Sequence, residues 1–190
     1  MKIEFSTRRF WLAVLCTAFL SLLVQQQVNA QVSPEAELAF QRANMSVTRQ
    51  GTEPVQFNLP LLSGGNTTLA AHRGQVVILY FWTSWCHACV STMPSLEALH
   101  LRFRNQGLEI LAINVGEDPS AVRHFISSTR YTFPVLLDRD HHVASQYGVR
   151  GVPGFFIIDR SGRLISSFVG GRNWDSPEHI AAIDALLRSP

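Results

Sequence analysis

Three features are scarce in this sequence of 190 residues: cysteine, net charge and long apolar runs. The chain has three cysteines and a formal net charge of +2 at pH 7. Residues 1–30 hold three of its sixteen basic and one of its fourteen acidic residues, so the remainder carries thirteen of each. A neutral remainder without a basic stripe gives no support for nucleic-acid binding. The apolar run at residues 10–24 is short for a membrane span, which needs about 20 residues.

The first thirty residues have the order of segments that is typical of an export signal. Basic residues come first, the apolar run follows, and small residues then stand at the spacing that a signal peptidase requires; these are Lys2, Arg8, Arg9, Val28 and Ala30. The pattern predicts cleavage after Ala30, with a retained N-terminal membrane anchor as the alternative. The chain is then expected in the periplasm or at the outer face of the cytoplasmic membrane.

The chain is expected to have three parts. Residues 1–30 are the signal peptide or N-terminal membrane anchor. A capping serine followed by proline and glutamate predicts a helix that begins near residue 33, so residues 31–52 form an N-terminal helix and linker. Residues 53–190 form the main domain, which has enough apolar residues for a core of its own.

The number and spacing of the cysteines indicate a redox reaction. Cys16 lies within the apolar run and is expected to leave with the signal, so Cys86 and Cys89 remain. Exported proteins meet an oxidising environment, in which thiols form or exchange disulfides. A disulfide between residues so close in sequence closes a very short loop and adds little stability in the loop-entropy picture. The pair therefore points to redox exchange rather than to a structural bridge.

The apolar pattern of the main domain predicts an α/β sandwich with a mixed sheet. The runs at residues 75–82 and 109–115 are typical of strands buried on both faces, and apolar residues at helical spacing predict a helix over residues 86–105. Further helices are expected over residues 33–44, 118–128, 140–147 and 176–187. Further strands are expected over residues 55–62, 67–69, 133–137, 154–159 and 164–169.

The position of the cysteines at a helix start explains how one sulfur can react. Only a thiolate attacks a disulfide, and the free N–H groups and positive dipole end of a helix stabilise a thiolate. A strand brings the chain to Trp85, and the helix starts at Cys86. Cys86 is therefore predicted to be the exposed nucleophile, and Cys89, three residues on and underneath, the resolving cysteine.

Four segments resemble the thioredoxin superfamily; they are residues 81–94, 114–117, 147–153 and 171–178. The first holds the motif Trp-Cys-His-Ala-Cys and Pro94, and the third ends in Pro153. The second and fourth segments, and an added helix and strand between residues 115 and 140, are similar to the TlpA/ResA group of exported, often membrane-tethered, thioredoxins. The similarity covers about residues 53–188.

This resemblance implies a thioredoxin-like three-layer sandwich with a mixed central sheet, an added N-terminal segment and a central βα insertion. It implies an active site of Trp85, Cys86 and Cys89, with His87 and Ala88 between the cysteines, and no cofactor or bound metal. It further implies a cis peptide bond before Pro153, beside which the main chain of Val152 pairs with a bound substrate strand.

The resemblance also implies partners. A TlpA/ResA-type protein reduces exported proteins that carry thiols or disulfides, such as apocytochrome c or a copper-site thiol pair. It is itself recharged by a membrane electron carrier of the DsbD/CcdA kind. The opposite direction, a periplasmic disulfide oxidant or isomerase, stays open because neighbouring charge shifts the potential of such a couple.

Two departures from the family pattern put proton transfer by a carboxylate in doubt. Thioredoxin-like reductases often keep a buried acid near the cysteines, but Tyr80 and Thr92 stand at the two positions concerned. Glu117 is the remaining candidate, at the end of the neighbouring strand. The alternative for Glu117 is an exposed side chain, or one that starts the next helix.

His87 has two interpretations of equal weight. A charged imidazole beside Cys86 would favour the thiolate and make the couple more oxidising. Alternatively, His87 is an exposed residue that faces partner proteins with little electronic effect. The adjacent His141 and His142 are expected at the surface rather than on a metal ion.

Three other classes of function are weaker alternatives. A copper- or metal-binding thioredoxin-like module lacks a second pair of cysteines to complete the ligand set. A peroxidase of the peroxiredoxin type has a proline seven residues before its cysteine, where this chain has Leu79. A redox-inert scaffold would not require both Cys86 and Cys89.

Overall fold

A computed structural model describes residues 32–48 and 50–189 of the chain. The predicted signal or anchor at residues 1–30 lies outside the described residues. Within the described ranges, no helix is both long enough and apolar enough to cross a bilayer.

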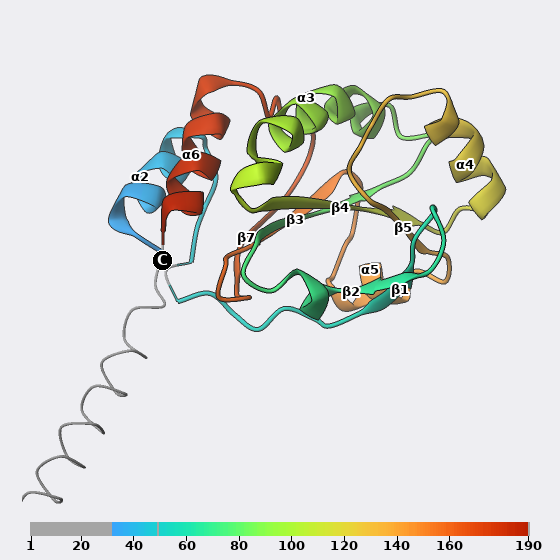
Figure 1. Ribbon diagram of the computed structural model, residues 1–190, viewed down its shortest axis with the longest axis horizontal. Coiled ribbons are helices and arrows are strands. Elements are labelled where there is room, and N and C mark those ends of the chain that lie inside the picture. The colour runs from blue at the N-terminus through green and yellow to red at the C-terminus, as the bar shows by residue number, and fades with distance from the viewer. Residues whose placement is uncertain (1–31, 49, 190) are drawn as a thin grey trace, which may run out of the picture. The chain divides into compact units, whose positions relative to one another are not determined.

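The centre of the fold is a five-stranded sheet with the strand order β5-β4-β3-β6-β7 (Figure 1). Its strands are β3 (Val76–Trp82), β4 (Leu108–Val115), β5 (Val135–Asp138), β6 (Gly154–Ile158) and β7 (Leu164–Val169). β4 runs parallel to β3 and β5, whereas β6 is antiparallel to β3 and β7. All seven residues of β3 are buried, as their unbroken apolar sequence predicts. The predicted mixed sheet is confirmed.

Helices and a small hairpin cover the two faces of this sheet. Side chains at even positions of β3 pack with α2 (Pro34–Arg42), α3 (His87–Phe103), α4 (Pro119–Ser127) and α6 (Pro177–Arg188). Side chains at odd positions pack with α5 (His142–Gln146) and with the hairpin of β1 (Asn58–Pro60) and β2 (Asn66–Thr68). Figure 1 shows α3 on one side of the sheet and α5 on the other, which confirms the three-layer sandwich.

Capping residues set where the helices begin. Ser33 and Ser176 accept hydrogen bonds from the backbone N–H groups of Ala36 and His179, so α2 and α6 start at the prolines that follow the caps. The two helices pack against each other through buried residues such as Phe40 and Ile183. The N-terminal helix is thereby attached to the same core as the sheet.

The region before the sheet differs from the sequence prediction. Residues 55–62 were expected to form one edge strand, but only β1 (Asn58–Pro60) is a strand, and it pairs with β2. The end of the segment does reach the edge of the main sheet, where Leu61 forms a single antiparallel bridge with Leu136 of β5. Pro54 and Pro60 have no N–H to donate to a ladder, which limits the length of any strand between them. The helix predicted over residues 86–105 ends at Phe103 and continues as η2 (Arg104–Gln106), a turn of 3-10 helix.

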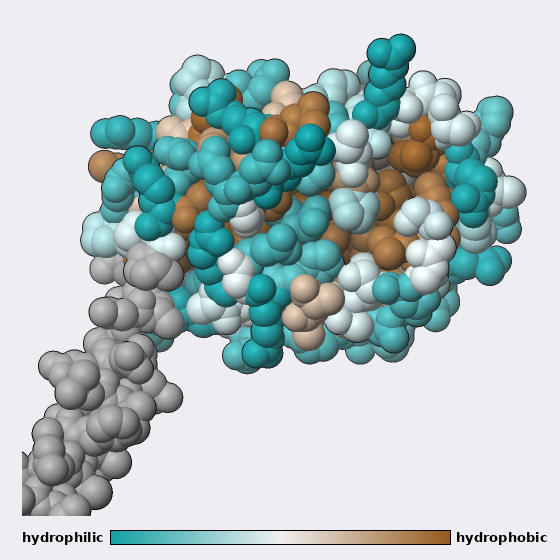
Figure 2. All heavy atoms as spheres, in the orientation of Figure 1, coloured by the Kyte–Doolittle hydropathy of each residue, from teal (hydrophilic) through white to brown (hydrophobic). Residues whose placement is uncertain are grey.

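Apolar side chains reach the surface beside α4. Figure 2 shows a group of them between α4 and the β1–β2 hairpin. The groove there is lined in part by Leu62, Ile126, Phe133 and Val135. It contains none of the residues predicted for the cysteine site.

Candidate functional site: a cysteine pair at the start of α3

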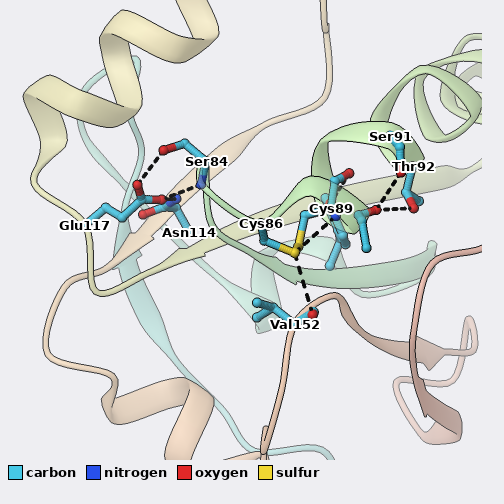
Figure 3. The surroundings of a disulfide bond; sticks show 10 residues. Ser84, Cys86, Cys89, Ser91, Thr92, Asn114, Glu117 and Val152 are labelled. Carbon is cyan, nitrogen blue, oxygen red and sulfur yellow. Dashed lines mark hydrogen bonds between the residues drawn. A yellow bond between two sulfur atoms is a disulfide. The ribbon is translucent and has the colours of Figure 1, made fainter.

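The cysteine pair lies where β3 leaves the sheet and α3 begins. Cys86 is the N-cap of α3, and Cys89 lies in its first turn. The sulfur of Cys86 accepts a hydrogen bond from the backbone N–H of Cys89 at 3.2 Å. The two residues form a disulfide, with their Cα atoms 5.2 Å apart (Figure 3). The helix start thus directs a backbone N–H group at the sulfur of Cys86, a contact that stabilises a thiolate.

The two cysteines differ in their access to solvent. Cys89 is fully buried, whereas Cys86 is half-buried. Trp85 is 75% exposed despite its size, and His87 and Ala88 are also exposed. The structure therefore places the residues predicted from the motif around one accessible sulfur, with the second sulfur beneath it.

The loop that ends in Pro153 lies against the cysteines. The Val152–Pro153 peptide bond is cis, as the resemblance implies. The carbonyl oxygen of Val152 lies 3.6 Å from the sulfur of Cys86, close enough for a reduced Cys86 thiol to donate to it (Figure 3). Val152 is half-buried and Pro153 is buried.

Hydroxyl groups, rather than carboxylates, contact the first turn of α3. The Tyr80 hydroxyl donates to the backbone carbonyl of Cys89 at 2.9 Å, and the Thr92 hydroxyl donates to that of Ala88 at 2.8 Å. Burial raises the pKa of the Tyr80 hydroxyl well above its ordinary value, so this group stays protonated and keeps donating. Within the described ranges, no carboxylate is hydrogen-bonded to either cysteine.

Glu117 is placed differently from the expectation of an exposed or helix-starting residue. Its carboxylate accepts hydrogen bonds from the backbone N–H and the hydroxyl of Ser84, at 2.7 and 2.6 Å. The side-chain amide of Asn114 donates to it as well, at 2.6 Å (Figure 3). The next helix is capped instead by Asp118, whose side chain accepts from the backbone N–H of Ser120.

Comparisons with known proteins show the family of this chain. A profile of the AhpC/TSA family matches residues 51–167. The thiol-disulfide oxidoreductase ResA of Geobacillus thermodenitrificans is 36% identical over 134 residues, which cover 70% of this chain and 77% of the relative. The chain belongs to the AhpC/TSA family. The ResA of Halalkalibacterium halodurans is 29% identical over 164 residues, covering 86% of this chain and 88% of the relative.

Solved structures place this AhpC/TSA-family chain among thioredoxin-fold proteins. A structure from Chlorobium tepidum, described as the thiol:disulfide interchange protein DsbE, has a TM-score of 0.67 and 30% identity, and covers 72% of this chain and 96% of its own. StoA from Bacillus subtilis, at 22% identity and a TM-score of 0.58, supports the fold alone. The similar oxidoreductases and the disulfide-bonded pair identify the activity as thiol–disulfide exchange.

The segment after β7 contacts both the loop of Pro153 and the start of α3, since the backbone N–H of Gly170 donates to the carbonyl of Pro153 at 2.9 Å. Gly171 lies over Thr92, so close that a Cβ atom at residue 171 would stand 2.9 Å from the Thr92 hydroxyl oxygen. Trp174 is fully buried in the core, with its ring centroid 5.1 Å from that of Phe155.

His141 and His142 lie at the surface, as expected. The ring of His141 lies against Gly116, and His142 begins α5. In the two described stretches, no group of three or more histidine, cysteine or acidic residues is arranged to hold a metal ion.

Two residues of the site were not predicted as functional from the sequence: Ser84 and Asn114. Ser84 looks like an ordinary residue of a polar loop, and nothing local connects it to Glu117, which lies 33 positions away. Asn114 gives a clearer signal, because it is a polar residue near the end of an apolar strand and is only 1% exposed. A buried amide needs hydrogen-bond partners, so it indicates a polar site.

Proposed function

We propose that this oxidoreductase reduces disulfides in exported proteins, with Cys86 as the attacking sulfur and Cys89 as the resolving one. The difference in burial between the two cysteines supports these roles most directly. An incoming disulfide can reach the sulfur of Cys86, whereas Cys89 is reached only from within the protein.

The reaction takes two exchange steps. In the reduced protein, the Cys86 thiolate attacks one sulfur of the substrate disulfide, a mixed disulfide forms, and the other substrate sulfur leaves as a thiolate. Cys89 then loses its proton and attacks the Cys86 sulfur, which releases the second substrate thiolate and closes the Cys86–Cys89 disulfide. Two electrons pass from the protein to the substrate. The start of α3 stabilises the first thiolate because the N–H group of Cys89 donates to the Cys86 sulfur and the positive end of the helix dipole lies there.

The surroundings of Cys86 suit a substrate that binds in an extended conformation. The Val152 carbonyl lies beside the Cys86 sulfur, and main-chain groups there can pair with a substrate strand of any sequence. Trp85 adds an exposed apolar surface next to the same sulfur. Recognition is then largely by main chain and apolar contact.

The direction of exchange, the clients and the location are proposed here on the basis of the family resemblance. Similarity to proteins named ResA and DsbE supports a reductase for exported clients such as apocytochrome c or a copper-site thiol pair. Each turnover oxidises the cysteine pair, so the protein needs an electron supply, for which we propose a membrane carrier of the DsbD/CcdA kind. The location is the periplasm or the outer face of the cytoplasmic membrane, reached through residues 1–30 as a cleaved signal or a retained tether.

One observation favours the opposite direction. His87 is the first residue of α3 and is exposed, directly beside the attacking sulfur. An imidazolium at this position stabilises the reduced form, which makes the couple more oxidising. A periplasmic oxidant or isomerase is therefore the second candidate function.

The reduction potential of the Cys86/Cys89 couple decides between these directions. It is measured in the full chain with Cys16→Ser, by trapping thiols across redox buffers of known potential. A reductase is expected to have a potential near or below that of thioredoxin, about −270 mV. A potential near that of a strong oxidant, about −120 mV, would contradict the reductase proposal, and His87→Ala would then be the first variant to examine.

A further inference from the structure

We propose that Glu117 is a positioning residue that holds the loop leading to Cys86, and that it carries no proton in the reaction. The loop consists of residues 83–85 and is called the Cys86 loop below. The inference rests on the proposed function, because it takes Cys86 as the attacking sulfur.

Glu117 binds the Cys86 loop at its middle residue. Both the backbone N–H and the hydroxyl of Ser84 donate to the carboxylate, one to each oxygen. Two bonds to one residue fix the direction of the loop as well as its distance from β4. Ser84 stands two positions before Cys86 and next to Trp85, so its placement determines how both are presented.

Glu117 is itself held firmly at the end of β4. Asn114, which donates to it, lies opposite Trp82 in the parallel ladder of β3 and β4. Gly116 turns the chain with a φ of 74°, and the ring of His141 occupies the space that a Cβ atom at residue 116 would need. The carboxylate thus links the ends of β3 and β4, the two central strands of the sheet.

The contacts of Glu117 do not suit a proton carrier. Its two oxygens already accept three hydrogen bonds, two from Ser84 and one from Asn114. Within residues 32–48 and 50–189, no hydrogen bond joins it to either cysteine. The groups that contact the turn around Cys89 are instead the hydroxyls of Tyr80 and Thr92.

The chain contains a matched control in Glu97. Its carboxylate accepts hydrogen bonds from the backbone N–H and the hydroxyl of Thr132, at 2.9 and 2.8 Å. This is the same pattern as between Glu117 and Ser84, and the two glutamates are both half-buried. Glu97 fixes a loop before β5 that carries no cysteine. Its replacement by alanine therefore removes a similar pair of hydrogen bonds and leaves the Cys86 loop unchanged.

The experiment compares Glu117→Ala, Glu117→Gln, Ser84→Ala and Glu97→Ala in the full chain with Cys16→Ser. For each variant, kcat and KM are measured for reduction of the insulin disulfides with dithiothreitol as the electron donor, the alkylation rate of reduced Cys86 is measured from pH 5 to 9, and thermal unfolding is followed. We expect Glu117→Ala to slow exchange and alkylation about ten- to a hundredfold, since a small misplacement of a reacting group has effects of this size. Ser84→Ala keeps the hydrogen bond from the backbone N–H to Glu117 and should slow both reactions less.

Glu117→Gln separates positioning from proton transfer. A glutamine has nearly the same shape, and its amide can donate to the Ser84 hydroxyl oxygen while its own oxygen accepts from the Ser84 N–H. We expect it to restore most of the activity lost in Glu117→Ala, with the midpoint of the pH profile unchanged. Glu97→Ala should lower the unfolding temperature and leave the rates unaltered.

Two results would overturn the proposal. If Glu117→Gln is as slow as Glu117→Ala and loses one limb of the pH profile, then Glu117 carries a proton. If Glu117→Ala matches Glu97→Ala, with lower stability and normal rates, then Glu117 is only structural. Neither result depends on the direction of exchange, which the reduction potential tests separately.

Discussion

The two sulfurs of the disulfide have opposite surroundings. Cys86 is half-buried at the start of α3, beside the exposed Trp85 and the main chain of Val152. Cys89 is fully buried, with Tyr80 bonded to its carbonyl. One helix turn therefore separates a sulfur that can meet another protein from one that can meet only its neighbour. This difference, more than the motif alone, supports the order of the two exchange steps proposed above.

Replacement of each cysteine by serine is expected to have the largest effect and tests the different roles of Cys86 and Cys89. Cys86→Ser is expected to reduce insulin disulfide exchange to the uncatalysed rate, because no accessible thiolate remains. Cys89→Ser keeps the attacking sulfur and should accumulate a mixed disulfide with the substrate, detectable by mass spectrometry. Accumulation of that species in Cys86→Ser instead would reverse the two roles.

Loss of the Tyr80 hydroxyl tests the buried side. Tyr80→Phe removes the hydrogen bond to the Cys89 carbonyl and leaves the ring in place, so the free energy of unfolding should fall by about 1 kcal/mol. Urea unfolding of the reduced protein measures this change. A Tyr80→Phe variant as stable as the parent would mean that the hydrogen bond from the Tyr80 hydroxyl does not stabilise the turn around Cys89.

Removal of the Trp85 ring tests the exposed side. Because this ring is 75% exposed, Trp85→Ala should change the free energy of unfolding by less than about 0.5 kcal/mol. Its expected effect is a several-fold increase in KM for a protein disulfide, with little change for a small-molecule disulfide. An equal loss with both substrates would show that Trp85 orients Cys86 rather than binding clients.

The smallest expected effect is a pH dependence of the free energy of unfolding that comes from His179. The ring of this residue lies 5.5 Å from that of Trp174. Burial lowers its pKa, the positive charge of Arg172 lowers it further, and Glu178 opposes the shift. The unfolded chain therefore binds this proton more readily than the folded one. The contribution of His179 to the free energy of unfolding should be fully present above the ordinary pKa of histidine, about 6.5, and should be lost as the pH falls below it.

Urea unfolding between pH 5 and 8 measures this effect. His179→Gln should give a flatter dependence of stability on pH over that range than the parent chain. An unchanged slope in the variant would show that His179 does not contribute.

The sequence predicts best those features that neighbouring residues determine. Ser33, Asp118 and Ser176 cap helices at the positions where their patterns predict a start. The unbroken apolar run of β3 predicts its burial on both faces. The position of Cys86 at a helix start also follows from local sequence, and so does the order of burial of the two cysteines.

Contacts between distant residues could not be predicted in the same way. Ser84 and Glu117 meet only because β3 and β4 are parallel and end at the same edge of the sheet. The hydroxyl of Tyr80 reaches Cys89 across the interface between β3 and α3, so a position noted only for lacking an acid turns out to support the first turn. The extent of β1 depends on its pairing with β2, which the prolines around it restrict but do not reveal.

The different accessibility of Cys86 and Cys89 is tested by the rate at which each thiol of the reduced protein is alkylated. Iodoacetamide is added at neutral pH to the chain with Cys16→Ser, and the modified cysteine is identified by mass spectrometry over time. We expect Cys86 to react quickly and Cys89 to stay unmodified until the protein unfolds. Equal reaction of the two thiols, or faster reaction of Cys89, would contradict it.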